Sequence, residues 1–181
     1  MKKIISILVC ALLMVSMLAG CGKKSQFDGL ASKMQAIKSG DFSKLQDMAP
    51  EAYWELREDN DDEFDIKDLI DEKTENFEDE TADEREDVYG KNWKVSVSVD
   101  DEQKLDKDEV ADIAEALDES FKIDEDEVTD AYYVWLYTNI EGDEDRSHGI
   151  AKYTAVKISG KWYLCSSYEY DNTLRVYFAG I

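Results

Sequence analysis

The chain has 181 residues, of which 21 are basic and 43 are acidic, so its formal net charge at pH 7 is −22. Nucleic-acid binding needs a basic footprint, and this balance excludes nucleic acid as a partner. The charge is uneven, because residues 51–87 hold 19 acids against 4 bases while residues 131–181 hold 6 against 5. Anionic lipid headgroups would also repel the acidic part, within about 8 Å at physiological salt.

The first twenty residues have the pattern of a secretory signal. Lys2 and Lys3 precede an apolar run of 16 residues, Ile4 to Ala19, which ends in small residues. A charged start, an apolar middle and a small-residue end are typical of a cleaved signal. The alternative is a transmembrane helix, but a span needs about 20 apolar residues. We therefore predict that residues 1–20 are removed.

The end of this segment, Leu18-Ala19-Gly20-Cys21, resembles the lipobox of bacterial lipoproteins. The resemblance implies cleavage between Gly20 and Cys21 and a diacylglycerol on the Cys21 thiol. The protein would then be lipid-anchored at the extracytoplasmic face of the cell membrane. Residues 21–24 would form the anchor and a short tether, with Lys23 and Lys24 as a small basic foot, and residues 25–181 a single domain. Loss of Lys2 and Lys3 changes the net charge from −22 to −24.

Cysteine usage agrees with this layout. Of the three cysteines, Cys10 would leave with the signal and Cys21 would carry lipid, so only Cys165 remains. No intrachain disulfide can then form, and the domain must rely on an apolar core. Cys165 lies in an apolar strand-like stretch, and we expect a buried, inert thiol.

Helical patterns come first in the domain. Apolar residues recur at helical spacing from Phe27 to Ile37, with Ser25 and Asp28 as an expected capping box and Gly40 as the stop. A second helix is expected from Asp41, a short one from Pro50, and a third from Asp65 to about Phe77. The acidic segment 78–87 is expected to be a solvated helix end or a loop.

Strand patterns follow, with one helix between them. Apolar and polar residues alternate over 93–99, and further strands are expected at 128–140, 150–158, 161–170 and 174–178. A helix over about 106–121 separates the first two strands, with Asp106 and Glu109 as its cap. The predicted fold class is α+β: N-terminal helices packed on a curved antiparallel sheet of four to five strands, covered on one face.

Two segments resemble small lipoproteins with a cystatin-like, nuclear transport factor 2-like domain. They are AIKSGDFSKL (36–45) and VKISGKWYL (156–164). In that family a curved sheet wraps helices and leaves a conical cavity. The helix at 106–121 is an addition to the simplest version of that fold.

The aromatic residues give the candidate binding site. Tyr133, Trp135 and Tyr137 share one face of the expected strand 128–140, and neighbouring strands offer Tyr153 and Tyr163. Aromatic rings with a polar tip suit ligand pockets and partner surfaces. They also suit the ordinary core of a sheet, and this alternative stays open.

No catalytic residue and no metal-ligand set is assigned from the sequence. The only histidine, His148, follows Asp143 and Asp145 at an acidic turn, where we expect it to be solvated. Acid runs such as 59–63 lack the pattern of a calcium-binding EF-hand loop, so we interpret them as solvated faces with at most weak calcium binding. No cofactor is expected apart from the covalent lipid.

The sequence therefore favours a non-catalytic ligand- or protein-binding module of the cell envelope, held to the membrane by its lipid. Its partner would be a protein, a peptide or a small molecule. Two alternatives stay open. One is a cavity enzyme of the same fold, an isomerase, dehydratase or hydrolase. The other is an acidic, cation-binding structural protein of the envelope.

Overall fold

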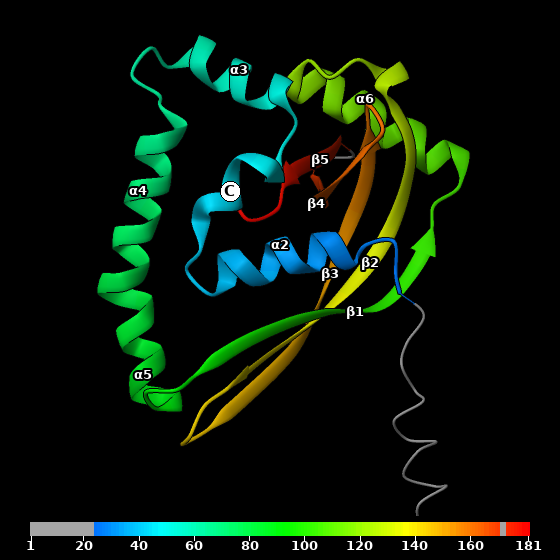
Figure 1. The fold of residues 1–181 in the computed structure, drawn as a ribbon. Helices are drawn as coiled ribbons and strands as arrows, with labels where there is room; N and C mark the ends of the chain where they lie inside the picture. The colour runs from blue at the N-terminus through cyan, green and yellow to red at the C-terminus, as the bar shows by residue number, and fades with distance from the viewer. Residues whose placement is uncertain (1–23, 171–172) are drawn as a thin grey trace, which may run out of the picture.

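The computed structural model describes residues 24–170 and 173–181, and its strands form one antiparallel sheet in the order β1-β2-β3-β4-β5 (Figure 1). The signal segment, the cleavage residue Gly20 and the lipidation residue Cys21 lie outside the described residues. Each strand pairs with its neighbour in sequence, which confirms an α+β fold with a curved five-stranded sheet. The strands are β1 (Lys94–Lys104), β2 (Val128–Glu141), β3 (Arg146–Ile158), β4 (Lys161–Tyr170) and β5 (Thr173–Phe178).

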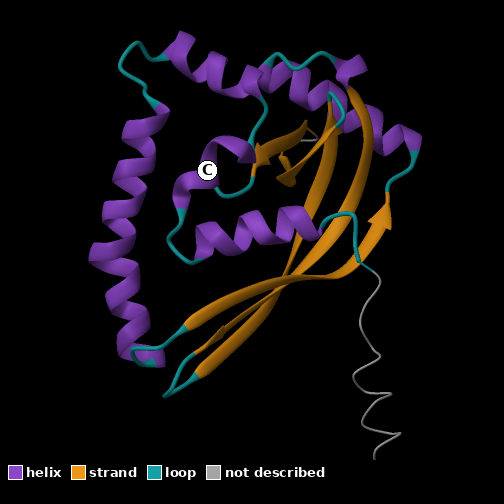
Figure 2. Cartoon of the chain, in the orientation of Figure 1, coloured by secondary structure: helices purple, strands orange, loops and turns teal. Residues whose placement is uncertain are grey.

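Most helical segments precede the sheet in the chain, and they surround it on several sides (Figure 2). They are α2 (Asp28–Lys38), η1 (Phe42–Met48), α3 (Glu51–Asn60), α4 (Ile66–Asn76), η2 (Phe77–Ala82) and α5 (Asp83–Tyr89), followed after β1 by α6 (Lys107–Phe121) and η3 (Glu125–Glu127).

The start of α2 differs from the expected capping box. Phe27 is the N-cap, and no side chain caps the helix. The Ser25 hydroxyl accepts a hydrogen bond from the Phe27 N–H at 3.1 Å and donates one to Glu102 at 2.6 Å. Phe27 is fully buried, with ring centroids 5.2 Å from Tyr132 and 5.0 Å from Trp162. Burial of this ring, rather than a cap by Ser25 and Asp28, fixes where the helix begins.

The acidic segment 78–87 is helical. α4, η2 and α5 follow one another without a break, and Figure 1 shows them as one long helix beside the rest of the fold. η2 is a π-turn that begins at Phe77, and no residue of these three segments is fully buried. Of the two expectations for this segment, the solvated helix is confirmed and the loop is wrong.

The predicted cap of α6 is confirmed. The Asp106 carboxylate accepts hydrogen bonds from the N–H groups of Asp108 and Glu109, both at 3.0 Å. In return the Glu109 carboxylate accepts from the Asp106 N–H at 2.9 Å. The buried stripe of the helix contains Ile113 and Leu117, so the cap and the apolar spacing agree on one helix.

The middle of the sheet is buried on both faces. The prediction that the sheet is covered on one face only is therefore wrong. Thr154, Ala155 and Val156 are consecutive in β3, yet their exposed fractions are 2%, 0% and 0%. Successive strand residues point to opposite faces, so both faces must be covered here. α2 covers one face, and α6 covers the other near β5, where Phe121 lies 5.5 Å from Phe178.

In the half of the sheet formed by β1, β2 and residues 146–153 of β3, one face is open to solvent. β4 pairs only with residues 154–158 of β3, so residues 146–153 pair with β2 alone. α2 covers the inner face, where Val95 and Val97 are buried. The Val97 N–H on the free edge of β1 is satisfied by the Gln35 side chain at 3.1 Å. The outer face of β1, β2 and β3 carries Tyr133, Trp135 and Tyr137 of β2.

Candidate functional site

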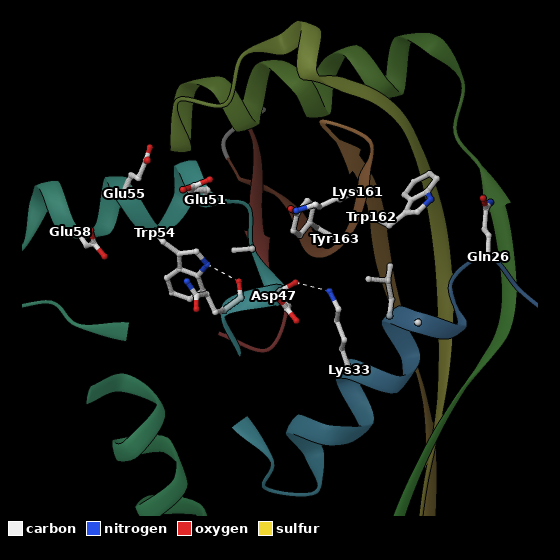
Figure 3. Close-up of a pocket in the computed structure, with 14 residues that line it drawn as sticks. Gln26, Lys33, Asp47, Glu51, Trp54, Glu55, Glu58, Lys161, Trp162 and Tyr163 are labelled. Atoms are coloured by element: carbon white, nitrogen blue, oxygen red, sulfur yellow. Dashed lines mark hydrogen bonds between the residues drawn. The ribbon is translucent and has the colours of Figure 1, made fainter. Parts of the chain in front are cut away.

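A pocket of about 760 Å³ lies between α2, η1, α3 and the start of β4 (Figure 3). Its wall combines aromatic rings with charged side chains from four different elements. The lining residues used below are Lys33, Asp47, Glu51, Trp54, Glu55, Glu58, Lys161, Trp162 and Tyr163. Because β5 pairs only from Cys165 onward, the first residues of β4 have a free edge that faces this pocket.

The aromatic part of the wall is held rigidly. The Trp54 indole N–H donates to the Gln46 carbonyl at 3.0 Å, and its ring stacks on Phe64 at 6.2 Å. Tyr163 is 8% exposed, and its ring lies 6.1 Å from Phe178. Burial, together with the nearby Asp47 carboxylate, raises the pKa of the Tyr163 phenol. The phenol therefore stays protonated and can donate a hydrogen bond to a ligand.

The charged part of the wall is divided between two sides. Glu51, Glu55 and Glu58 are spaced four and three residues apart on α3, so they share one helix face. Figure 3 shows these carboxylates on the α3 side of the pocket, with Lys161 beside Tyr163 on the β4 side. The second ammonium group, that of Lys33, donates to the Asp47 main-chain carbonyl at 2.8 Å. The pocket can therefore hold a ligand with separated charges over an aromatic surface.

Three of the five aromatic residues predicted from the sequence lie together on the open sheet face. Tyr133 and Trp135 have ring centroids 6.3 Å apart, and Tyr137 follows on the same face of β2. The Lys152 ammonium lies 3.2 Å from the Tyr133 ring centroid and 5.6 Å from that of Trp135. Alternation along β2 was sufficient to place these rings on one side.

The other two aromatic residues lie elsewhere. Tyr153 pairs with Val134 on the inner face and is half-buried, and burial raises its pKa. Tyr163 lines the pocket. The five residues therefore do not form one site: three lie on the open face, one packs in the core and one lies in the pocket.

His148 and the two acidic residues near it are engaged on the outside of the molecule. The His148 ring lies 5.8 Å from Tyr137 on the open face. Asp143 accepts from the Asn92 amide at 2.6 Å, and Asp145 accepts from the Arg146 N–H at 2.7 Å. These contacts hold the hairpin turn, and the two carboxylates do not meet the imidazole.

Within residues 24–170 and 173–181, no group of three His, Cys, Asp or Glu side chains converges in a way that would hold a metal ion. Helices long and apolar enough to cross a membrane are likewise absent from that part of the chain. Cys165 is fully buried, and burial raises the pKa of its thiol far above the usual range, in line with an inert cysteine.

The charged residues of the pocket wall were not predicted from the sequence. The four- and three-residue spacing of Glu51, Glu55 and Glu58 was a readable signal for one helix face, but the facing Lys33 and Lys161 come from distant segments. Comparisons with protein-family models, with curated proteins and with solved structures found no match to this chain, so the functional argument depends on its own geometry.

Proposed function

We propose that this protein is a lipid-anchored, extracytoplasmic binding module without catalytic activity, and that the pocket between α2, α3 and β4 holds its ligand. The pocket is the observation that carries the proposal, because it is concave, about 760 Å³ in volume, and combines aromatic rings with charged groups of both signs. The lipobox ending at Cys21 supports the anchored location. The curved sheet packed on helices supports the resemblance to cystatin-like, nuclear transport factor 2-like lipoproteins.

The chemistry of the wall favours a peptide that carries a free amine. Four carboxylates, including those of Glu55 and Glu58 on α3, line the pocket together with two ammonium groups, so its wall has an excess of negative charge. An amine would lie at the α3 side, an apolar segment over Trp54, and a carboxylate or carbonyl near Lys161. Anionic sugars and phosphates fit this wall poorly.

The most buried titratable group of the pocket, the Tyr163 phenol, supports a binding role. A general base must lose its proton near neutral pH. Burial and Asp47 instead raise the pKa of Tyr163, which makes this phenol a donor rather than a base. The remaining titratable residues around the pocket are carboxylates and lysines.

Titration of the protein with a lysine-containing tripeptide tests the pocket. We expect binding that weakens about three- to tenfold in the double variant Glu55→Gln, Glu58→Gln, since each exposed charge pair contributes up to about 1 kcal/mol. Acetylation of the peptide amines should weaken binding to a similar extent. The control is Glu72→Gln, Glu75→Gln on α4, where both side chains are exposed and lie outside the pocket wall. Equal binding by both double variants would contradict the pocket assignment.

The anchor is tested separately in bacterial cells fed labelled palmitate. We expect the wild-type chain and a Cys165→Ala variant to incorporate label and to pellet with membranes. A Cys21→Ser variant should do neither. Recovery of an unlabelled wild-type chain that still carries residues 1–20 would refute the anchor while leaving the pocket assignment unaffected.

A further inference from the structure

We propose that the open aromatic face of the sheet rests on the surface of the bilayer to which Cys21 is attached. This face is defined here as Tyr133, Trp135, Tyr137, Ile150 and Lys152. The inference rests on the proposed anchor, and it assigns a second, non-covalent contact between the domain and the membrane.

The residues of the open aromatic face form one continuous outer surface. Ile150 pairs with Tyr137 and Lys152 pairs with Trp135 across the β2–β3 ladder. Ile150 is 56% exposed, and the three rings of β2 are only partly covered. Because paired residues of an antiparallel ladder point to the same side, all five side chains face outward together.

The five residues of the open aromatic face carry a single charge, that of Lys152, although the whole chain carries −22. On β1, Asp101 pairs with Trp135, Gln103 with Tyr133 and Ser98 with Tyr137. The Asp101 carboxylate thus offsets the Lys152 ammonium, and the exposed Asp100 carboxylate lies at the bulge beside Asp101. Charge depletion around a group of aromatic residues marks a contact surface rather than a solvated one.

The position of the tether indicates that the membrane covers the open aromatic face. Ser25 donates a hydrogen bond to Glu102 at 2.6 Å, so the chain enters the fold beside β1. Glu102 pairs with Val134, and the residues on either side of Val134 are Tyr133 and Trp135. The anchored chain therefore enters the domain one strand away from the open aromatic face, although on the other side of the sheet.

The tether is too short to let other surfaces reach the membrane. The four residue-to-residue steps from Cys21 to Ser25 span at most about 14 Å when fully extended. A domain of this size has a radius of gyration of about 15 Å, so its far side lies well beyond that reach. The surface that touches the bilayer is therefore one near Ser25, and the open aromatic face begins within one strand of that point.

The chemistry of the open aromatic face matches the membrane–water interface. Tyr and Trp are enriched there because an apolar ring carries a polar tip, and a lysine can bury its stem while its ammonium stays in water. A second copy of the anchored chain fits less well, since it would bring an equal charge of −24, that is −22 without Lys2 and Lys3, against the first. The contact should not need anionic lipid, because the face and the β1 carboxylates beside it have no excess of positive charge.

The test uses the chain from Cys21 onward, which contains the whole described core, Phe27 to Ala179. Its Cys21 thiol is coupled to a maleimide lipid in phosphatidylcholine vesicles, and buried Cys165 does not compete. Tryptophan emission is then measured with and without lipids brominated near the headgroup. The emission of Trp135 is obtained by difference from a Trp135→Phe variant. We expect bromolipid to reduce this emission at least about twofold, as for a ring at the interface.

A paired substitution tests the surface. In a Tyr137→Ser, Ile150→Ser variant the quenching of Trp135 should be lost. Val88→Ser removes another exposed apolar side chain, 51% exposed on α5, and should keep the quenching. Near-ultraviolet circular dichroism of each variant checks that the fold is intact.

Three results would overturn the proposal. One is an absence of quenching on coupled vesicles, which leaves the anchor untouched because the coupling is chemical. Another is quenching only with anionic lipid, which would assign the contact to Lys23 and Lys24. The third is found without vesicles: if iodide quenches Trp135 emission less as the protein concentration rises, the open aromatic face would be assigned to contact with a second copy of the chain.

Discussion

The Arg85 guanidinium of α5 donates a hydrogen bond to the carbonyl oxygen of Lys38, the last residue of α2. The carbonyl groups at the end of a helix lack partners within it and carry partial negative charge, so a cation is favourable there. The guanidinium also lies 5.3 Å from the Phe77 ring centroid and 5.1 Å from that of Trp93. Burial among these groups lowers the pKa of Arg85. This residue joins the long acidic helix to the body of the domain.

Arg85→Ala should release that helix. Loss of a partly buried, charged hydrogen bond and two cation–π contacts should lower the free energy of unfolding by about 1–3 kcal/mol. Amide hydrogen exchange should rise over residues 66–89 more than in the sheet. Arg146→Ala, at an exposed arginine of the β2–β3 hairpin, should change stability by less than about 0.5 kcal/mol. Unchanged exchange over 66–89 would show that Arg85 does not hold the helix.

Alanine substitutions at two glycines of the β2–β3 hairpin should have different effects on stability. A Cβ on Gly142 would overlap the main-chain oxygen of Tyr89, whereas one on Gly149 would meet nothing within 4 Å. Gly142→Ala should therefore force the turn away from α5 and lower the free energy of unfolding by about 2 kcal/mol or more. Gly149→Ala should be neutral or slightly stabilising, since glycine weakens a strand. Denaturant unfolding of both variants makes the comparison, and similar losses in the two would contradict it.

Stability should fall at alkaline pH because of two tyrosines. Burial raises the pKa of both Tyr153 and Tyr163 in the folded state. The unfolded chain therefore loses these protons first, and the free energy of unfolding falls as pH rises above about 10, the pKa of an exposed tyrosine. The contribution is complete below that pH. A Tyr153→Phe, Tyr163→Phe variant should lose less stability between pH 9 and about 11 than the wild type. An equal loss would mean that other groups control the alkaline limit.

Salt should stabilise the domain without a preference for calcium. The described residues contain no convergent group of three metal-ligating side chains, while the charge of −22 repels itself. Raising ionic strength from about 0.01 to 1 M shortens the screening length from about 30 to 3 Å, so the melting temperature should rise. Sodium and calcium chlorides at equal ionic strength should act alike. A larger rise with calcium, accompanied by heat of binding, would favour the cation-binding structural role.

Local chemistry made much of this fold predictable. Asp106 and Glu109 lie three residues apart, and that spacing alone predicted a cap that the structure confirms. Alternation along β2 placed Tyr133, Trp135 and Tyr137 on one face because strand periodicity needs no tertiary information.

Other features depend on contacts between distant segments, and the sequence did not reveal them. The long helix forms a π-turn at Phe77, whose ring fills the space beside Gly40, where a Cβ would lie 2.5 Å from the ring. The same ring meets Phe42 and Trp93 at 6.0 and 6.3 Å. The pocket is a similar case, since Lys33 and Lys161 are 128 positions apart in the chain.

The strand order β1-β2-β3-β4-β5 bears on how an exported chain would fold after it leaves a translocation channel. Such a chain emerges from its N-terminus, and here each strand after β1 pairs with the strand that precedes it in the chain. The longest segment between two paired strands is the one from Lys104, the end of β1, to Val128, the start of β2, and it contains α6. Contacts that are close in sequence favour rapid folding and limit exposure of unpaired edges. The sheet could therefore grow hairpin by hairpin in the order of its synthesis, without a late strand having to insert between two earlier ones.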